Sequence, residues 1–399
     1  MKTFKDLKIN RELFEKLESM NIKTPTDIQE KTIPLILKGR DIIGQSATGS
    51  GKTLAFGSNL LEIIIPGKGI QALILTPTRE LAVQVTDNLS KFYIRKVRNI
   101  IAIYGGVSFD RQARIINSSE VIVATPGRLL DHINQKTIDL SKVKLLVLDE
   151  ADRMLDMGFI DDVEKIIQNC PKERQTLFFS ATMPSTIKIL AKKYMNNPEE
   201  ISTVKHVDPA KLKQVYYDIQ KNLKLSLLIH LLKKEKKGLV MVFCNTRRNT
   251  DFLEKNLKHN GINAIAIHGG LSQNKRSNTM KLFNSNKCSV LVCTDVASRG
   301  LHINNVSHVY NYEAPKDSKE YIHRIGRTAR AGNEGIVVNL ICEYDHENFS
   351  KILQENRELN IESIKKPHIE KVFAVMDNKR QQRKPQNNNF QRKRYNMAY

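Results

Sequence analysis

Long hydrophobic runs and paired cysteines are both missing from this sequence of 399 residues. No apolar stretch approaches the roughly 18 residues that a membrane-spanning helix requires, so we expect no membrane span. The start of the chain has no apolar core of the kind that secretory signals carry, and we expect a cytoplasmic protein. The five cysteines form no Cys-x-x-Cys pair, which argues against a zinc site and favours reduced thiols.

Acidic residues are few relative to basic ones. The sequence has 64 lysines and arginines against 42 aspartates and glutamates, a net charge of +22. The excess is uneven, because residues 365–399 alone carry ten basic and two acidic residues, a net charge of +8. Such a surface attracts polyanions, either nucleic acid or an acidic membrane face; charge that serves only solubility is the alternative.

Short apolar runs alternate with segments of helical periodicity, which predicts an α/β fold with parallel sheets covered on both faces. The expected strands are 42–44, 70–76, 100–103, 121–125, 143–149 and 176–180, then 238–244, 264–267, 289–294, 306–311 and 336–340. Polar residues interrupt the series, so we predict two domains, 1–205 and 213–365, joined by a linker at 206–212. Residues 366–399 are rich in Asn, Gln, Lys and Arg, and we expect them to form a disordered basic tail.

A glycine-rich segment follows the first expected strand. It reads Ser46-Ala47-Thr48-Gly49-Ser50-Gly51-Lys52-Thr53 and precedes a helical stretch. Glycines let the backbone turn tightly, so that successive amides face phosphate oxygens. Lys52 can reach the β- and γ-phosphates of a nucleotide, and the Thr53 hydroxyl can bind Mg²⁺. The match to the general phosphate-loop pattern is imperfect, because Ser46 stands in the position of the first glycine.

Two acidic residues, Asp149 and Glu150, end another buried strand. Ligands of open parallel sheets bind at the carboxyl ends of the strands, so we expect these acids beside the phosphate loop. Asp149 would hold Mg²⁺ through its water shell, and Glu150 would orient and help deprotonate the attacking water. The sequence therefore predicts hydrolysis of a nucleotide.

The segment Asp149-Glu150-Ala151-Asp152, with the motifs on either side of it, resembles the DEAD-box ATPases of helicase superfamily 2. The resemblance covers about residues 4–345. It implies two tandem RecA-like domains, ATP and Mg²⁺ as cofactors, and an RNA-stimulated ATPase. Residues 21–29 resemble the family's Q motif, which implies that Gln29 pairs with the N6 and N7 edge of adenine and that Phe4 offers a stacking face.

Matching motifs in both halves of the chain imply an RNA-binding surface. Hydroxyls, glycine amides and arginines bind phosphate without reading bases. The implied RNA-binding residues are Thr78, Arg79, Gly105, Gly106, Thr125, Gly127, Arg128, Thr246, Arg276 and Thr294. Ser180 and Thr182 resemble the motif that links hydrolysis to strand separation, with Asp152 and His323 as their expected partners.

Residues 321–330 resemble another motif of the family. Arg327 and Arg330 would be arginine fingers that neutralise charge on the transferred γ-phosphoryl group, an effect of about 10³–10⁵ in rate. Ala329 stands where glycine is commonest in the family. His302 stands where the family has an acid that contacts the ATP ribose, so we expect weaker nucleotide binding, which His302→Asp would strengthen. The expected catalytic residues are Lys52, Asp149, Glu150, His323, Arg327 and Arg330.

The resemblance implies a monomeric RNA helicase whose two domains close on ATP and single-stranded RNA. Two other functions fit the same residues, namely an ATP-gated RNA clamp or annealing factor and a DNA-directed helicase of the same superfamily. A kinase or GTPase does not fit, since the sequence has neither a kinase catalytic loop nor a guanine-reading Asn-Lys-x-Asp motif. We expect the basic tail to tether RNA; a merely solvated end is the alternative.

Overall fold

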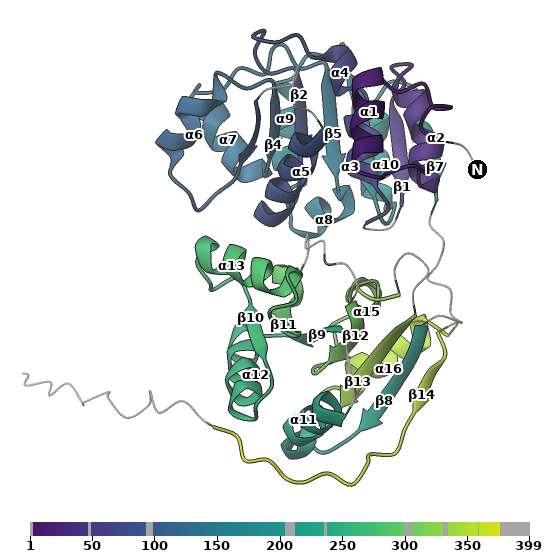
Figure 1. Ribbon diagram of the computed structural model, residues 1–399, viewed down its shortest axis with the longest axis vertical. Helices are drawn as coiled ribbons and strands as arrows, with labels where there is room; N and C mark the ends of the chain where they lie inside the picture. Colours follow the sequence, from purple (N-terminus) through teal and green to yellow (C-terminus); the bar gives the residue numbers. More distant parts are fainter. Residues whose placement is uncertain are drawn as a thin grey trace, which may run out of the picture.

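The computed structural model of the chain consists of two α/β domains, which lie one above the other in Figure 1. It describes residues 3–46, 49–92, 99–203, 212–234, 238–298, 303, 306–329, 334–357 and 359–375. Within these ranges, no helix has both the length and the apolarity needed to cross a membrane. Most of the expected linker, residues 206–211, and the end of the expected tail, residues 376–399, lie outside them.

Seven parallel strands form the sheet of the first domain, in the order β3-β4-β2-β5-β6-β1-β7. The strands are β1 (Ile42–Gln45), β2 (Ala72–Leu75), β3 (Ile100–Ile103), β4 (Val121–Ala124), β5 (Leu145–Asp149), β6 (Gln175–Ser180) and β7 (Glu199–Ser202). The strands β2, β4, β5 and β6 are buried along their whole length. Burial on both faces explains why these strands read as continuous apolar runs in the sequence.

The second domain repeats the topology of the first. Its seven parallel strands follow the order β10-β11-β9-β12-β13-β8-β14, which is the first order with every strand number raised by seven. The strands are β8 (Leu212–Asp218), β9 (Leu239–Cys244), β10 (Ala264–Ile267), β11 (Val290–Thr294), β12 (Val306–Asn311), β13 (Gly335–Ile341) and β14 (Ile361–Ser363). The expectation of two tandem parallel-sheet domains is therefore confirmed.

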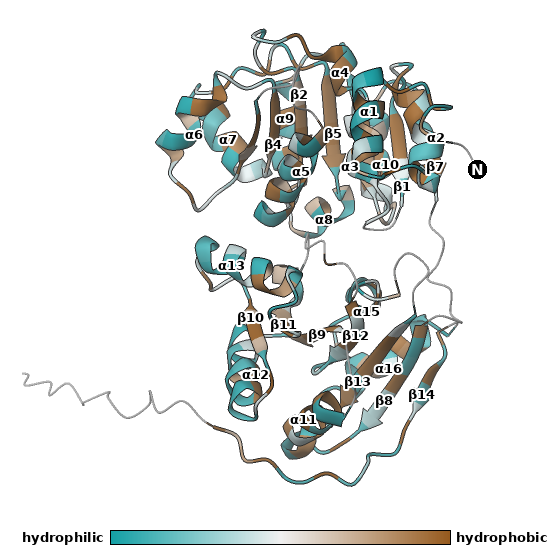
Figure 2. Cartoon of the chain, viewed as in Figure 1, coloured by the Kyte–Doolittle hydropathy of each residue, from teal (hydrophilic) through white to brown (hydrophobic). Residues whose placement is uncertain are grey.

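Helices cover both faces of each sheet, and Figure 2 shows the strands as the most hydrophobic part of each domain. Side chains alternate between two clusters, with Ile74 on one face of β2 and Leu73 on the other. The helices of the first domain are α1 (Arg11–Ser19), α2 (Asp27–Ile36), α3 (Lys52–Gly57), α4 (Leu60–Ile63), α5 (Arg79–Phe92), α6 (Phe109–Ile116), α7 (Pro126–Asn134), α8 (Ala151–Asp156), α9 (Ile160–Gln168) and α10 (Ser185–Tyr194). Those of the second are the 3₁₀ helix η2 (Lys221–Leu223), α11 (Lys224–Lys234), α12 (Arg247–His259), α13 (Gln273–Asn284), α14 (Asp295–Ser298), α15 (Ser318–Ile325) and α16 (His346–Glu355).

Three strands were not expected from the sequence, namely β7, β8 and β14. The edge strands β7 and β14 are half-buried or exposed throughout, so they lack the apolar run that marks the central strands. In β8, exposed Lys213 and Asp218 interrupt the hydrophobic pattern. Leu212, placed in the expected linker, is in fact the first residue of β8 and is buried.

The predicted start of the disordered tail, residue 366, is too early, because the structure describes residues up to 375. Residues 364–375, which we call the C-terminal strap, run across α11 and α12 of the second domain (Figure 1). Val372 N donates a hydrogen bond to Ser226 Oγ at 3.0 Å, and Val375 N donates one to Asn256 Oδ1 at 2.7 Å. Apolar side chains of the strap also pack against the core, which is why this basic segment is held in place.

Candidate functional site

The phosphate loop lies between β1 and α3, at the carboxyl end of the first sheet. The carbonyl of Ser46 accepts a hydrogen bond from Lys52 Nζ at 3.2 Å, and its hydroxyl accepts one from Ser50 Oγ at 2.9 Å. A turn of this kind before a helix presents backbone N–H groups to an anion. Ala47 and Thr48, expected in the same loop, lie outside the described residues.

Gln29 holds the phosphate loop from the side of α2. Its Nε2 donates to the carbonyl of Gly51 at 2.9 Å, and its Oε1 accepts from the backbone N–H of Thr26 at 2.9 Å. Gly51 has a φ angle of 91°, and a Cβ atom there would lie 2.3 Å from Gln29 Nε2, so only glycine fits. Gly49, with a φ angle of 85°, has the same left-handed backbone. The Gln29 amide keeps a second N–H and a second oxygen lone pair for another partner.

Phe4 does not present an open aromatic face, contrary to the expectation from the Q motif. Its side chain is 1% exposed and belongs to a hydrophobic cluster of the first domain. Leu7 and Leu13 are buried in the same cluster, so the ring anchors the N-terminal segment to the core.

Asp149 is the last residue of β5 and is buried. Its Oδ1 atom has no hydrogen-bond partner among the described residues. Burial raises the pKa of Asp149 to about 6, and the positive charge of Lys52 opposes that rise. Mg²⁺ prefers oxygen ligands, so this unpartnered carboxylate oxygen and the Thr53 hydroxyl at the start of α3 form a donor set that fits the ion.

Glu150 lies in a strained backbone conformation directly before α8. Its φ angle is 55°, a left-handed value that is uncommon for residues other than glycine and is often found at functional sites. Its carboxylate pairs with Arg153 NH1 at 2.7 Å, and both side chains are buried. Sequence reasoning missed Arg153, although its position three residues after Glu150 on a short helix places the two side chains on one face.

Asp152 joins the acidic segment to the turn after β6. Its Oδ2 accepts hydrogen bonds from the backbone N–H of Thr182 at 2.9 Å and from the Thr182 hydroxyl at 2.8 Å, and its own N–H donates to Ser180 Oγ at 3.2 Å. Burial favours the neutral form of Asp152, but these hydrogen bonds outweigh it and lower its pKa. The phosphate loop is tied to the same turn, because Ser46 N donates to the Ser180 carbonyl at 2.9 Å. The structure therefore brings the three expected coupling residues together.

His323 and Arg327 lie on the second domain, in α15 and just after it. Both line a small cavity of about 10 Å³ together with Asp295. Arg330 and His302 lie outside the described residues. The roles of Arg327 and Arg330 as arginine fingers and the ribose contact at His302 stay predictions.

Arg324, in the same motif, has a structural role. It is 1% exposed, and its Nε and NH2 atoms contact the Asp295 carboxylate at 2.7 and 2.6 Å. Its NH1 atom donates to Asn311 Oδ1 at 3.1 Å, which ties α15 to the end of β12. Ala329, which follows in the motif, has a φ angle of 53°, and this left-handed backbone explains why the family commonly has glycine there.

A groove of about 360 Å³ lies between the two domains. The expected RNA-binding residues that line it are Thr78, Arg79, Gly105, Thr125, Gly127, Arg128 and Arg276. Gly106 leaves room for the Arg79 guanidinium, since a Cβ atom at this position would lie 2.2 Å from Arg79 NH1. Its φ angle of 86° also favours glycine. The groove thus joins the starts of α5 and α7 in the first domain with α13 in the second.

Polar contacts join the two domains within the described residues. Glu80 Oε1 pairs with Arg276 Nε at 2.8 Å and accepts a hydrogen bond from Gln273 Nε2 at 3.2 Å. Lys319 Nζ contacts Asp156 Oδ1 at 2.6 Å. These residues belong to α5 and α8 of the first domain and to α13 and α15 of the second, and Figure 1 shows these two pairs of helices on the facing sides of the domains.

Thr246 and Thr294, also expected to bind RNA, lie on the second domain but do not line the 360 Å³ groove. Thr246 precedes α12, and its side chain accepts a hydrogen bond from Asn249 N at 3.1 Å. Thr294 ends β11 at the carboxyl edge of the second sheet. Both are therefore at strand or helix ends, where phosphate binding is common.

One lining residue that sequence reasoning missed is Gly269, which follows β10. A Cβ atom on Gly269 would lie 3.3 Å from Arg247 NH2, just as one on Gly105 would lie 3.2 Å from Arg79 NH2. A glycine pair therefore meets an arginine at the same place in both domains. The sequence signal was present, because a Gly-Gly pair follows the third strand of each sheet.

Two protein families match the chain. Residues 26–190 match the DEAD/DEAH box helicase family, and residues 223–332 match the helicase conserved C-terminal domain. Among curated relatives, the chain is similar to the DEAD-box ATP-dependent RNA helicase CshA of Bacillus subtilis, with 42% identity over 374 residues, 93% of this chain and 76% of the relative.

Solved structures show the same two-domain fold. Yeast Dbp5 bound to RNA and ADP BeF3 is 31% identical and superposes with a TM-score of 0.82 over 92% of this chain and 96% of that protein. A DEAD box protein from Methanococcus jannaschii is 41% identical but superposes at only 0.54, over 91% and 99% of the two chains. The chain belongs to the DEAD-box family of ATP-dependent RNA helicases.

Proposed function

We propose that this chain is an ATP-dependent RNA helicase whose catalytic centre is split between its two domains. The observation that carries the proposal is the placement of the candidate groups. Lys52, Asp149 and Glu150 lie on the first domain, and Arg327 lies on the second. Hydrolysis would then require that the domains close on each other.

On the first domain, the phosphate loop and Lys52 bind the phosphates of ATP. Gln29 uses its remaining N–H and lone pair for adenine. Its existing hydrogen bonds to Gly51 and Thr26 connect the adenine site to the phosphate loop. Thr53 and Asp149 would hold Mg²⁺, which would neutralise charge at the phosphates when bound. Glu150 orients the attacking water and accepts its proton.

On the second domain, Arg327 and Arg330 stabilise the charge that develops on the γ-phosphoryl group. The contacts of Glu80 with Arg276 and of Lys319 with Asp156 support closure, because they hold the two carboxyl edges of the sheets face to face. ATP and RNA that bind both domains would add to the stability of this closed arrangement.

RNA binds by its backbone in the groove between the domains. Arg79, Arg128 and Arg276 contact phosphates, and the glycine amides approach the chain closely. Closure bends the bound strand, which a regular duplex resists, so a few base pairs open locally. The hydrogen bonds of Asp152 with Thr182 and Ser180 link this movement to the phosphate loop.

Two comparisons test the proposal. ATP turnover is measured with single-stranded RNA and with single-stranded DNA of the same sequence, and we expect stimulation by RNA to be greater, because contacts to the 2′-hydroxyl distinguish the two. Equal stimulation would favour a DNA-directed or unselective helicase. Displacement of a short RNA duplex is measured in parallel, and ATP-dependent RNA binding without displacement would favour an RNA clamp.

We further propose that the protein acts as a monomer, because both halves of the split catalytic centre are on one chain. Sedimentation in the presence of ATP and RNA tests this. A stable dimer whose ATP turnover rises with protein concentration would contradict it.

A further inference from the structure

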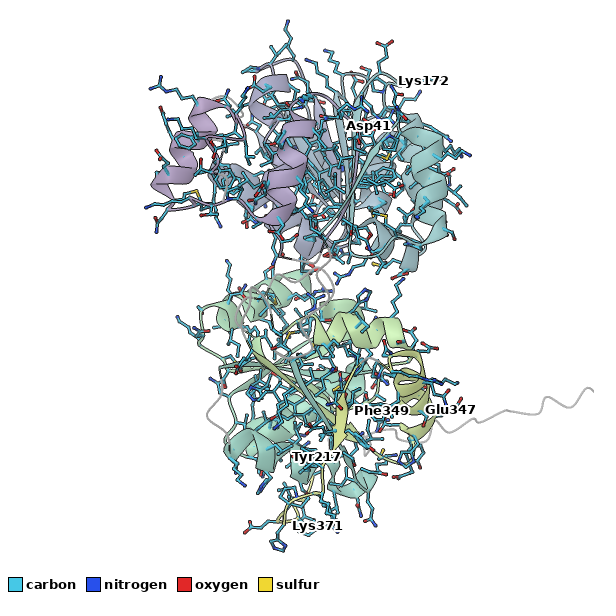
Figure 3. All side chains as sticks on the ribbon, turned by 90° about the vertical axis from the view of Figure 1, so that its right-hand side faces the viewer. Asp41, Lys172, Tyr217, Glu347, Phe349 and Lys371 are labelled. Carbon is cyan, nitrogen blue, oxygen red and sulfur yellow. The ribbon has the colours of Figure 1, made fainter. Side chains whose placement is uncertain are left out.

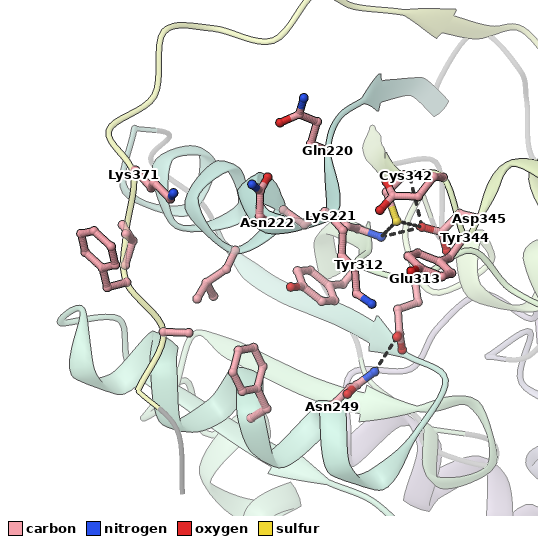
Figure 4. Close-up of a pocket in the computed structure, with 17 residues that line it drawn as sticks. Gln220, Lys221, Asn222, Asn249, Tyr312, Glu313, Cys342, Tyr344, Asp345 and Lys371 are labelled. Carbon is pink, nitrogen blue, oxygen red and sulfur yellow. Dashed lines mark hydrogen bonds and ion pairs between the residues drawn. The ribbon is translucent and has the colours of Figure 1, made fainter.

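A second groove, of about 1010 Å³, opens on the second domain away from the first. Its walls are η2, the start of α11, part of α12, the loop after β13 and the C-terminal strap (Figure 4). Figure 3 shows Lys371, on its rim, at the end of the molecule opposite to the first domain. None of the catalytic or RNA-binding residues discussed above lines this groove.

Aromatic side chains are the most unusual feature of the groove. Tyr344 is 72% exposed and Phe373 is 80% exposed, and both lie on its rim. Phe252 and Tyr312 are half-buried in its wall. Exposed aromatic rings of this size are uncommon on a surface without a binding function, and flat rings offer stacking faces.

Positive charge accompanies each exposed ring. Lys221 Nζ lies 4.2 Å from the centre of the Tyr344 ring, and Lys371 Nζ lies 5.9 Å from the centre of the Phe373 ring. Each rim position therefore combines a stacking face with a cation, the pair of groups that binds a base and its phosphate.

One of the three acidic residues that line the groove, Asp345, is paired with a lysine. Asp345 contacts Lys224 Nζ at 2.7 Å, where both side chains are buried. Glu313 accepts hydrogen bonds from the Asn249 side chain and from the Asn245 backbone. Glu313 keeps its negative charge, because neutral N–H donors do not cancel it, so Glu313 and Glu343 both lie on the wall with the rim lysines Lys221 and Lys371.

Amide side chains complete the set of groups. Gln220 and Asn222 line the groove beside η2, and their side chains make no hydrogen bond within the described part of the chain. Free amides of this kind can both donate to and accept from the edge of a base. Figure 4 shows both on the same wall, between Lys371 and Lys221.

We propose that this groove is a second binding site for single-stranded RNA, separate from the groove between the domains. Bases stack on Tyr344 and Phe373, Lys221 and Lys371 contact the phosphates, and the amides contact base edges. The strap is fixed beside the groove, since Val375 N donates a hydrogen bond to Asn256 Oδ1 on α12 at 2.7 Å.

Continuity with the basic end of the sequence favours RNA over an acidic peptide. Residues 376–399, which follow the strap directly, carry seven lysines and arginines and a single acid, Asp377. A polyanion that binds both the groove and this basic segment is held at two linked places, which raises the overall affinity. A short acidic peptide would bind only in the groove and would not gain affinity from the basic segment.

The test compares RNA strands of two lengths. Binding of fluorescent oligouridine is measured for the full chain and for the double variant Tyr344→Ala/Phe373→Ala. A strand of about six nucleotides occupies one site, whereas one of about 30 can reach both. We expect the variant to bind the long strand about tenfold more weakly and the short strand equally well. ATP turnover at saturating RNA stays unchanged, which keeps this result separate from the split catalytic centre.

Two controls make the test specific to the groove. The variant Tyr344→Phe/Phe373→Tyr keeps both rings and should bind the long strand as the original does. Chains shortened after Met376 should show the same loss on double substitution, since the groove is intact without the basic end.

Photocrosslinking of 5-iodouridine RNA locates the contact directly. We expect crosslinks to Tyr344 or Phe373 in addition to those between the domains. Crosslinks confined to the groove between the domains, or equal binding of the long strand by the alanine variant, would overturn the proposal and leave the groove to another class of partner.

Discussion

Four charged side chains meet around the phosphate loop, and all of them are buried. Lys52 and Arg153 are positive, Asp149 and Glu150 are negative, and Glu150 contacts Arg153 at 2.7 Å. Buried charges are costly unless they are paired, so burial of Asp149 favours its uptake of a cation or of a proton. This balance makes the site sensitive to pH and to magnesium.

The first prediction concerns the pH dependence of magnesium binding. Burial raises the pKa of Asp149 to about 6, so its carboxylate takes up a proton as the pH falls through that value. Because the proton and the cation compete, the Mg²⁺ concentration needed for half-maximal ATP turnover should rise about tenfold for each pH unit below 6. Magnesium titrations at several pH values measure this, and excess Mg²⁺ should restore turnover. A half-saturation that does not change down to the ordinary pKa of aspartate would refute the assignment.

The second prediction concerns Arg153 as a positioning residue for Glu150. Replacing it with Gln removes the buried ion pair between Arg153 and the Glu150 carboxylate. We expect kcat for ATP to fall by about 10- to 100-fold with little change in KM, because nucleotide binding depends on other residues. Steady-state kinetics measure both values. Arg153→Lys should retain more turnover than Arg153→Gln; equal turnover by the two variants, or an increase in KM alone, would contradict the role.

Helices and strands were predictable to the extent that they are buried. The central strands were found because continuous apolar runs mark them, and α5 begins and ends where its periodicity predicts. The edge strands β7 and β14 were missed because their exposed side chains carry no such pattern. The strap was predicted to be part of the disordered tail, because its sequence contains lysines and only a few apolar residues. Several of those apolar residues pack against the core of the second domain.

The third prediction is that the strap stabilises the second domain. Removing residues from 364 onward exposes the apolar surface that the strap covers on α11 and α12. We expect the free energy of unfolding of this domain to fall by about 2–4 kcal/mol, as burial of a few aliphatic side chains implies. Chemical denaturation measures it, and a chain shortened only from residue 378 is the matched control, which should unfold like the full chain. Equal stability of both shortened chains would show that the strap contributes nothing.

The fourth prediction separates the basic end of the sequence from the strap. A chain shortened from residue 378 should bind single-stranded RNA more weakly, because it loses seven lysines and arginines. Its affinity should also depend less steeply on salt, since fewer counterions are released on binding. Binding measured over a range of salt concentrations gives the slope, and an unchanged slope would exclude this segment from RNA binding.

The arrangement of the two domains could not be predicted from the sequence, although the motifs on each domain could. A motif such as the phosphate loop is local, so its residues identify it wherever it occurs. The contacts that bring the domains together join residues far apart in the sequence, such as Glu80 with Arg276, and each partner alone looks like an ordinary surface charge. The repeated topology explains why both domains carry their functional residues at the carboxyl ends of strands.

The split catalytic centre is tested most directly by ATP turnover of the purified protein with and without single-stranded RNA. We expect slow hydrolysis alone, marked stimulation by RNA, and loss of that stimulation in the variant Arg327→Ala/Arg330→Ala, because arginine fingers contribute about 10³–10⁵ in rate. Variant and original should bind ATP to a similar extent. Full-speed hydrolysis without RNA, or RNA-stimulated hydrolysis that persists without both arginines, would contradict the account.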